Sequence, residues 1–204
     1  FSGSKIAASE AAQCPTLLAN GFGEHRIEGI GDKHVPWIHN VKNTDLVIAV
    51  DDEASVSAIR LFNEPAGKRH LAGRGLEPAL IEKLSLLGIS GAANLISAIK
   101  MAKWYELGRE SVVMTVLTDS VEMYRSRLSE LNAERGAFTE VDAAVAHERH
   151  ILGASTDLME ELSYPARKRV HNLKYYTWVE QQGKTHAEIQ EQWHDDEYWT
   201  GIPE

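Results

Sequence analysis

The chain has 204 residues, of which 43% are hydrophobic and 25% are charged, and its formal net charge is −9. This length and composition are typical of a globular protein with one ordinary core and an appendage. The acidic balance excludes a nucleic-acid surface, which needs clustered Lys and Arg, and no apolar run reaches the roughly 18 residues of a membrane helix. Cys14 is the sole cysteine and cannot form an internal disulfide, so a reducing, cytoplasmic location is expected.

Two apolar runs in the first quarter of the chain predict strands. Residues 5–11 are mostly small and apolar, and a loop follows them. Residues 45–51 place a continuous apolar run between two aspartates, as expected for a parallel strand that is covered on both faces. Asp51 or Asp52 is expected to cap the next helix, over residues 53–63, which has one apolar side.

The middle of the chain predicts a loop over residues 64–75 and a helix over residues 77–87. Ser90 is expected to cap a further helix that runs to about Leu107. The small residues that follow Ser90 would let the start of this helix press closely on a sheet.

Residues 112–118 are the stretch around which the prediction is organised. Apolar residues dominate this run, and it ends at Thr118, Asp119 and Ser120, which is typical of a buried strand followed by a polar turn. Ligands bind at that end of a strand in open α/β sheets. The next helix is expected to run to about Glu134 and to end at Gly136.

The residues after 137 predict helices and carry most of the net negative charge. Capping boxes begin at Thr139 and Thr185, and Pro165 suits the first turn of a helix over residues 165–182. The shift in charge suggests a boundary near Gly136 and a division into 1–137 and 138–204. No metal site is predicted, because His147 and His150 lack metalloprotease spacing and an identifiable third ligand.

The run over residues 116–124 resembles the proline-aspartate-serine turn of cysteine synthase and cystathionine β-synthase, which are fold-type II enzymes that use pyridoxal 5'-phosphate. In that family the serine hydroxyl meets the pyridine nitrogen of the cofactor, and the matching residue here is Ser120. Thr118 stands where the family has proline. Asp119, the neighbour of Ser120, is the other candidate for this cofactor contact. Neighbouring residues in a strand point to opposite faces, so only one of the two can face the cofactor. Only the resemblance favours Ser120 over Asp119.

A second segment, Glu28 to Pro36, is similar to the family segment whose glycine backbone lies against the cofactor ring. Gly29 and Ile30 are therefore expected to line the cofactor pocket, because a Cβ would hold the chain away from a flat ligand; a plain glycine turn is the alternative. Lys33 and His34 depart from the better known members and are candidates for substrate contact or proton transfer, or else ordinary surface residues.

The resemblance covers residues 5–128 with two insertions, and a third matching run, over residues 88–93, packs behind the cofactor in the family. The resemblance implies an α/β fold, a three-layer sandwich with a mostly parallel sheet. Residues 1–137 would form the C-terminal part of the catalytic domain, and 138–204 a helical extension. The implied reaction is β-elimination or β-replacement on a serine- or cysteine-like amino acid, since a hydroxyl at the ring nitrogen makes a weak electron sink.

Two motifs of the family are not found in the sequence: the serine-x-lysine segment that binds the cofactor covalently, and the glycine- and threonine-rich phosphate loop. Lys5 does not match the lysine pattern. The chain begins with Phe1 and is expected to be the C-terminal piece of a longer enzyme, inactive alone. The alternatives are a subunit of a split enzyme, and a non-catalytic association module. The expected partners are the missing amino-terminal half or further copies of the chain.

Overall fold

The computed structural model describes residues 3–200, which fall into two compact units. Unit 1 comprises Phe1–Glu24, Gly31–Ala49 and Leu158–Glu204. Unit 2 comprises His25–Ile30 and Val50–Asp157. The chain therefore leaves unit 1 and returns to it, so residues far apart in sequence share one core.

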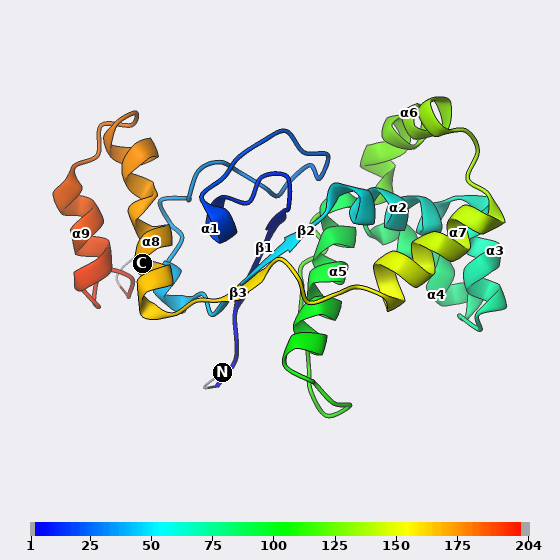
Figure 1. Cartoon of the computed structure of the whole chain (residues 1–204), viewed down its shortest axis with the longest axis horizontal. Coiled ribbons are helices and arrows are strands. Elements are labelled where there is room, and N and C mark those ends of the chain that lie inside the picture. Colours follow the sequence, from blue (N-terminus) through cyan, green and yellow to red (C-terminus); the bar gives the residue numbers. More distant parts are fainter. Residues whose placement is uncertain (1–2, 201–204) are drawn as a thin grey trace. The chain divides into compact units, whose positions relative to one another are not determined.

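Unit 1 contains a three-stranded sheet of order β1-β2-β3, with strands β1 (Ala7–Ala11), β2 (Leu46–Val50) and β3 (Met159–Glu161). β2 and β3 are antiparallel, with Ile48 opposite Met159. The arrows of β1 and β2 point the same way in Figure 1. Strands β1 and β2 were predicted, and the full burial of β2 agrees with its unbroken apolar run. The larger sandwich with a mostly parallel sheet stays a prediction.

The helices of unit 1 pack against this sheet and against one another. They are α1 (Thr16–Ala19), the 3-10 helix η1 (Val41–Asn43), α8 (Tyr164–Asn172), the π-helix η5 (Tyr175–Val179) and α9 (His186–His194). Val170 of α8 packs on Val35 and Val41, while Val47 of β2 contacts Leu162 and Ala166. The single helix predicted over residues 165–182 is wrong, because the backbone changes from an α-helix to a π-helix after Leu173.

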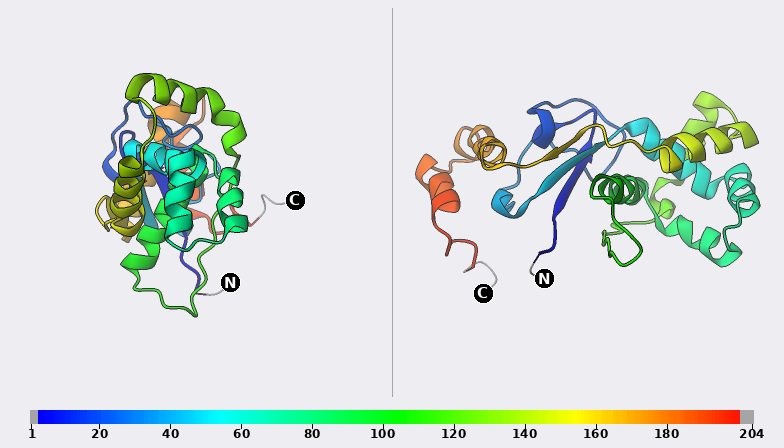
Figure 2. Two further views of the ribbon diagram at one scale, coloured as in Figure 1. Left: turned by 90° about the vertical axis from the view of Figure 1, so that its right-hand side faces the viewer. Right: turned by 60° about the horizontal axis from the view of Figure 1, so that its bottom comes forward.

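Unit 2 is helical among the described residues (Figure 2). Its elements are α2 (Asp52–Asn63), α3 (Pro65–Gly73), α4 (Pro78–Lys83), η2 (Leu84–Leu86), α5 (Ile89–Trp104), η3 (Val121–Tyr124), α6 (Arg125–Arg135), α7 (Glu140–Ala146) and the π-helix η4 (His147–Leu152). Helix α2 packs on α3, α5 and α7. Asp51 caps α2 by accepting a hydrogen bond of 2.8 Å from the Glu53 N–H, as predicted.

Two predictions for unit 2 are wrong. Residues 65–73 form helix α3 in place of the predicted loop, because Pro65 occupies the first turn, where its missing N–H costs nothing. Residues 112–118 form no strand in this chain: Val112 is 83% exposed and Met114 is 89% exposed. A buried strand needs partners on both sides, and the described chain supplies none for this run.

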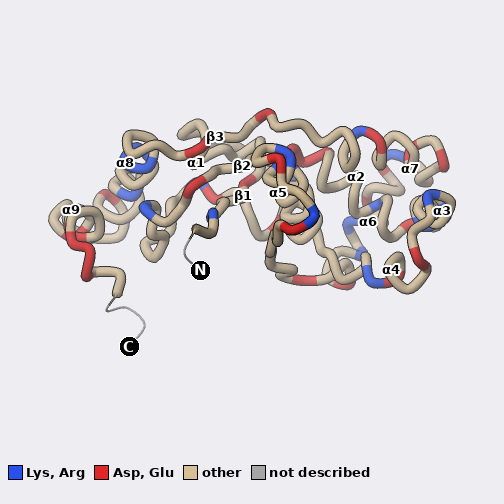
Figure 3. Tube along the Cα trace, turned by 90° about the horizontal axis from the view of Figure 1, so that it is seen from below, with Lys and Arg blue, Asp and Glu red and all other residues tan. Residues whose placement is uncertain are grey.

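Charged side chains of both signs are distributed along the helices of unit 2, while in unit 1 Lys and Arg gather on α8 (Figure 3). Ion pairs join many of the exposed side chains, among them Arg69 with Glu140 and Arg74 with Glu148. Among the described helices, none by itself has the length and hydropathy to cross a membrane; the bent pair Pro78–Leu86 and Ile89–Trp104 meets the criteria only when its members are taken together.

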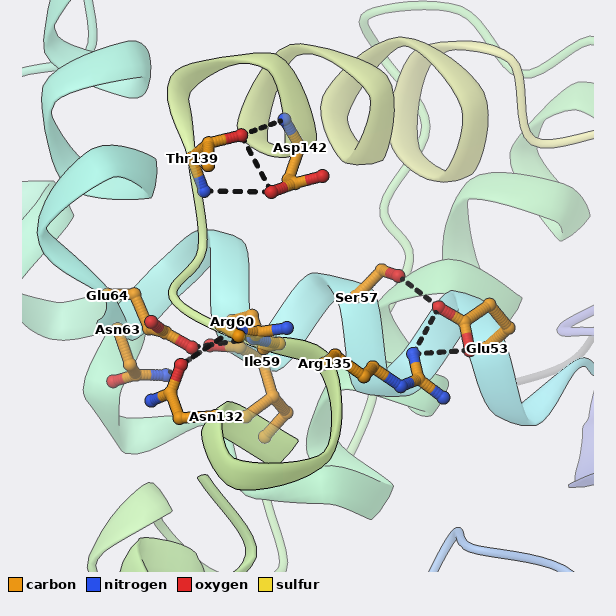
Figure 4. Close-up of polar contacts among 11 residues, drawn as sticks. Glu53, Ser57, Ile59, Arg60, Asn63, Glu64, Asn132, Arg135, Thr139 and Asp142 are labelled. Carbon is orange, nitrogen blue, oxygen red and sulfur yellow. Dashed lines mark hydrogen bonds and ion pairs between the residues drawn. The ribbon is translucent and has the colours of Figure 1, made fainter. Parts of the chain in front are cut away.

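The division predicted at residues 137 and 138 falls inside unit 2. Phe138 is buried there, and the guanidinium of Arg60 lies 4.9 Å from the centre of its ring. Arg60 also donates to the carbonyl oxygen of Gly136, and the capping box of Thr139 and Asp142 starts α7, which packs on α2 and α3 (Figure 4). The sequence around the predicted boundary thus belongs to one core.

Helix α3 allows a direct test of the packing in unit 2. A Cβ on Gly67 would lie 2.0 Å from the carbonyl oxygen of Leu61, so either backbone must move. We expect Gly67→Ala to lower the free energy of unfolding by about 3 kcal/mol. Gly73→Ala, in the same helix with no atom within 4 Å of the added Cβ, should change it by less than about 1 kcal/mol. Denaturant unfolding of both variants measures the difference, and equal stabilities would contradict this packing.

Candidate functional site

The loop that contains Gly29 lies against the start of α5. Gly29 has φ +98°, a conformation that favours glycine, and a Cβ there would lie 3.3 Å from Ser90 Oγ. Two contacts hold the loop just before the glycine. The Arg26 N–H donates to Asp52 at 2.6 Å, and Glu28 pairs with Arg127 at 2.8 Å. The backbone of Gly29 is thus placed closely against Ser90.

The first turns of α5 hold the segment that leads to Ser120. Ser90 Oγ and Thr118 Oγ1 are hydrogen-bonded at 2.6 Å, and the Gly88 N–H donates to the carbonyl oxygen of Asp119 at 3.0 Å. Ser90 was predicted to cap α5, which is wrong, because Gly88 is the capping residue and the Ser90 hydroxyl binds Thr118. The three matched sequence segments therefore meet at Ser90.

The carboxylate of Asp119 is engaged inside the protein. The Tyr124 hydroxyl donates to Asp119 Oδ2 at 2.5 Å. Asp119 Oδ1 is buried without a hydrogen-bond partner among the described residues, beside Gly88. Burial, together with the Asp119 carboxylate, raises the pKa of Tyr124 above its usual value, so its proton stays on the phenol. Asp119 is thus placed to fix the turn before Ser120.

Ser120 lies at the end of this turn, and its hydroxyl makes no hydrogen bond to the described residues. The residue is half-buried, and its carbonyl oxygen accepts a hydrogen bond of 3.1 Å from the Met123 N–H. Within residues 3–200, no hydrogen bond occupies the Ser120 hydroxyl. It can therefore donate to or accept from an external group.

The other candidate site residues, Ile30, Lys33 and His34, make fewer contacts with the rest of the protein. Ile30 is half-buried and closes a turn with Ile27, 3.4 Å from N to O. Lys33 is exposed, and Nδ1 of the His34 ring lies 2.9 Å from an oxygen of Asp32. Lys33 and His34 belong to unit 1, whereas Gly29, Ile30, Asp119 and Ser120 belong to unit 2.

Sequence reasoning missed Tyr124 and the Ser90–Thr118 pair. Tyr124 was predicted only to lie in the helix that follows Ser120. Its position five residues after Asp119, across one polar turn, was the available signal. The Ser90–Thr118 bond links residues 28 positions apart, and only the tertiary structure reveals such a link.

A shallow depression of about 600 Å³ lies elsewhere, among α8, η5 and α9 of unit 1. Lys168, Arg169, Tyr175, Tyr176 and His186 are among its lining residues, and none of the predicted site residues lines it. For metals, no group of three or more His, Cys, Asp or Glu side chains within residues 3–200 is placed to hold an ion. His147 instead meets His70, with 3.1 Å between Nδ1 and Nε2.

The start of α5 provides a test of this local geometry. A Cβ on Gly88 would lie 1.8 Å from Asp119 Oδ1 and 2.8 Å from the Tyr124 ring. We expect Gly88→Ala to displace the turn, to break the Tyr124–Asp119 hydrogen bond and to cost about 2 kcal/mol of stability. Gly91→Ala, whose Cβ would make an ordinary 3.4 Å contact with a Leu87 side chain, is the matched control.

The measurement for this pair is the pH titration of the Tyr124 ring signals by NMR, together with unfolding. In Gly88→Ala, the pKa of Tyr124 should fall toward its ordinary value, because the phenol loses its acceptor and its burial. An unchanged titration in Gly88→Ala would contradict the arrangement of Gly88, Asp119 and Tyr124.

The chain is similar to cysteine synthases over part of its length. It is 31% identical over 121 residues to cysteine synthase B of Campylobacter jejuni, which covers 59% of this chain and 33% of that protein. It is 29% identical over 122 residues to a cysteine synthase of Staphylococcus aureus, with 60% and 33% covered. The chain spans about a third of the length of the curated relatives it matches. No family model and no solved structure matches it.

Proposed function

We propose that this chain is the C-terminal part of a pyridoxal-phosphate-dependent lyase or transferase that acts by β-elimination or β-replacement on a serine- or cysteine-like amino acid. The observation that carries the proposal is the meeting of three segments at Ser90. They are the loop of Gly29, the start of α5 and the turn before Ser120. The partial similarity to cysteine synthases supports the same reading.

The residues present fit one edge of the cofactor. Ser120 offers a hydroxyl that no described residue occupies, and Gly29, whose Cβ position faces Ser90, lets the loop lie close to the start of α5. When bound, pyridoxal phosphate withdraws electrons from the α-carbon of an amino acid. The phosphate grip and the covalent lysine of the family have no counterpart in this sequence, and under the proposal the remainder of the enzyme supplies them.

Each side chain of the site then has a separate task. In the complete enzyme, the Ser120 hydroxyl would bind the ring nitrogen of pyridoxal phosphate, and a neutral hydroxyl, unlike a carboxylate, would leave that nitrogen largely unprotonated. Asp119 does not compete for this contact, because Tyr124 holds its carboxylate and Gly88 adjoins it. Gly29 and Ile30 border the ring. Lys33 and His34 are proposed as substrate contacts on the resemblance alone; the His34 ring is hydrogen-bonded to the Asp32 side chain at 2.9 Å.

The fold proposed for the complete enzyme is the three-layer sandwich of the fold-type II family, with a larger and mostly parallel sheet. The missing part comes either from the same polypeptide or from a separate chain. Under this proposal the described chain keeps the ring-edge contacts but does not bind the cofactor covalently by itself.

The isolated chain mixed with pyridoxal phosphate is expected to show no visible absorbance of a lysine-bound cofactor. Co-expression with the part of the Campylobacter jejuni protein that this chain does not match should restore that absorbance and turnover. In the restored enzyme, Ser120→Ala should lower kcat roughly tenfold, since one hydrogen bond of about 1.5 kcal/mol corresponds to that factor. It should also shift the absorbance band.

Ser126→Ala is the matched control for this experiment, because Ser126 is an exposed serine on α6. It should leave both readouts unchanged. Lysine-bound absorbance in the isolated chain, or an unaltered spectrum and rate in Ser120→Ala, would overturn the assignment of Ser120.

A further inference from the structure

The depression among α8, η5 and α9 has the size of a small-molecule site. Its volume of about 600 Å³ lies within the roughly 300 to 1,000 Å³ that is usual for such sites. All of its lining residues belong to unit 1. Helices α8 and α9 lie beside each other in Figure 1, and the His171 ring of α8 contacts the carbonyl oxygen of Ile189 of α9 at 2.9 Å. The depression is therefore formed by helices that are tied together.

The lining of the depression is positively charged, although the chain as a whole is acidic. The chain has 30 Asp and Glu residues against 21 Lys and Arg, yet the lining contains Lys168 and Arg169 and no acidic residue. Arg169 is neutralised by Glu160 at 3.0 Å and also donates to the carbonyl oxygen of Leu17 at 2.9 Å. Lys168 has no such partner within residues 3–200. The depression thus has one uncompensated positive charge.

The ammonium group of Lys168 lacks the hydrogen bonds that a buried charge requires. Its Nζ is buried, and no group within the described part of the chain accepts a hydrogen bond from it. The Trp193 ring, whose centre lies 4.6 Å from Nζ, attracts the charge but leaves the N–H donors unused. Burial lowers the pKa of Lys168, as expected where no acceptor replaces the lost water. An anionic ligand that accepts from Nζ would supply the missing partner.

The Lys168 side chain can reach a ligand in the depression. Lys168 and Asn172 both line it, and they lie on one side of α8 because they are four residues apart. The flexible four-carbon stem of a lysine lets Nζ turn from the Trp193 ring toward an anion. On α9, the Gln190 side chain lies 3.1 Å from His186 Nε2, and both residues line the depression. Polar side chains from two helices therefore converge on it.

Aromatic side chains form the η5 part of the lining. The rings of Tyr175 and Tyr176 meet edge to face with their centres 5.9 Å apart, and the His186 ring lies 6.5 Å from that of Tyr175. Tyr175 is 38% exposed and Tyr176 is 59% exposed, so both have surface available for contact. The flat ring of a ligand can pack on such surface.

We propose that the depression binds a small organic anion that carries an aromatic ring, with Lys168 holding the anionic group and Tyr175 and Tyr176 contacting the ring. The inference does not depend on the proposed function, because none of the residues proposed for the cofactor or substrate lines the depression. A carboxylate and a phosphate ester would supply the same charge. One uncompensated cation fits a ligand with a single anionic group better than a strongly acidic partner chain.

The test measures binding to the whole chain by isothermal titration calorimetry with four probes. Phenyl phosphate and benzoate each combine a ring with an anion, inorganic phosphate lacks the ring, and phenol lacks the charge. We expect a Kd of about 1 mM or lower for phenyl phosphate, benzoate or both, and the tighter of the two identifies the anionic group. Inorganic phosphate and phenol should bind at least roughly tenfold more weakly, because each keeps only one of the two contacts.

Lys168→Met should weaken binding of the tighter probe at least roughly tenfold, because the ligand loses a charge-assisted hydrogen bond. The variant should be about as stable as wild type in urea, since it removes a buried ammonium that has no partner. Lys83→Met is the matched control, because Lys83 is an exposed lysine of α4 that does not line the depression. Its affinity should equal that of wild type.

Tyr176→Leu tests the ring contact with a variant whose folding is not at risk, because Tyr176 is mostly exposed. It should weaken binding of phenyl phosphate or benzoate at least roughly threefold. In NMR spectra of wild type, cross-peaks should join the ring protons of the probe to those of Tyr175 and Tyr176. Cross-peaks to other tyrosines in their place would locate the probe elsewhere and reject the site.

Three further results would contradict the inference. The first is no binding of phenyl phosphate or benzoate up to about 10 mM. The second is equal affinity for inorganic phosphate and for the probes with a ring, which would indicate a nonspecific contact with an anion. The third is an unchanged affinity in Lys168→Met, which would mean that the Trp193 contact alone accounts for the position of this lysine.

Discussion

Arg60→Met is expected to lower the free energy of unfolding by about 3 kcal/mol or more, because it removes one partner of a buried ion pair. The Arg60 and Glu64 side chains are only 7% and 12% exposed and are joined at 2.6 Å. The Arg60 guanidinium also donates to Asn132 at 2.7 Å and to the carbonyl oxygen of Gly136 at 2.8 Å. Figure 4 shows this cluster between α2 and the end of α6. Methionine fills the space but leaves these acceptors unpaired.

Two further variants separate the contributions to this effect. Arg69→Met breaks an exposed pair with Glu140 and should cost less than about 1 kcal/mol. Arg60→Lys keeps the charge but loses the planar fork that reaches several acceptors at once, so its stability should lie between those of wild type and Arg60→Met. Denaturant unfolding followed by circular dichroism measures all three. Equal costs for Arg60→Met and Arg69→Met would show that burial of the Arg60 cluster does not matter.

Local signals were sufficient where the structure is local. The apolar run at 45–51 correctly predicted strand β2. Asp51, one of the two predicted caps, is the cap of α2. Thr139 and Thr185 begin helices with capping boxes, as predicted. Each of these features depends on residues that are close together in the sequence. The error at residues 65–73 was also local, because the predicted loop ignored that Pro65 can start a helix.

Contacts between residues far apart in the chain could not be predicted from the sequence. Val112 and Met114 have the pattern of a buried strand, but the pattern cannot show whether a partner strand is present in the same chain. The composition shift near residue 137 suggested a boundary, yet Arg60 joins Phe138 to α2. For the candidate site, the resemblance selected Gly29 and Ser120, while the Ser90–Thr118 bond that brings their segments together required coordinates.

Lys174→Met is expected to destabilise the protein by about 2 kcal/mol at pH 7 and by more at higher pH. The Lys174 side chain is fully buried in unit 1, and no carboxylate within residues 3–200 pairs with it. Its Nζ donates to the carbonyl oxygens of Trp37 and His39 at 2.9 and 2.8 Å, and to Gln192 Oε1 at 2.7 Å. Nζ also lies 5.3 Å from the centre of the Trp199 ring. Methionine leaves the His39 carbonyl oxygen and Gln192 Oε1 without a donor, while the Trp37 carbonyl oxygen keeps the hydrogen bond of 3.2 Å from Gln192 Nε2.

The pH dependence follows from the burial of Lys174. Burial lowers the pKa of Lys174 to about 7, whereas the unfolded chain keeps the ordinary value near 10.4. Between these values the unfolded state binds the proton and the folded state does not, so the stability of wild type rises with pH in this window. Lys174→Met lacks this group. The difference in unfolding free energy between wild type and variant should therefore grow by about 2 kcal/mol from pH 7 to pH 9.

Lys184→Met provides the control for this prediction. Lys184 is 40% exposed and pairs with Glu188 at 2.9 Å, and its Nζ lies 5.0 Å from the centre of the Trp37 ring. Its replacement should cost less than about 1 kcal/mol, with little change over the same pH range. Urea unfolding of wild type and both variants at pH 7, 8 and 9 gives the three differences. A difference for Lys174→Met that stays constant over this range would mean that the buried ammonium keeps its proton, because the three acceptors outweigh the loss of solvation.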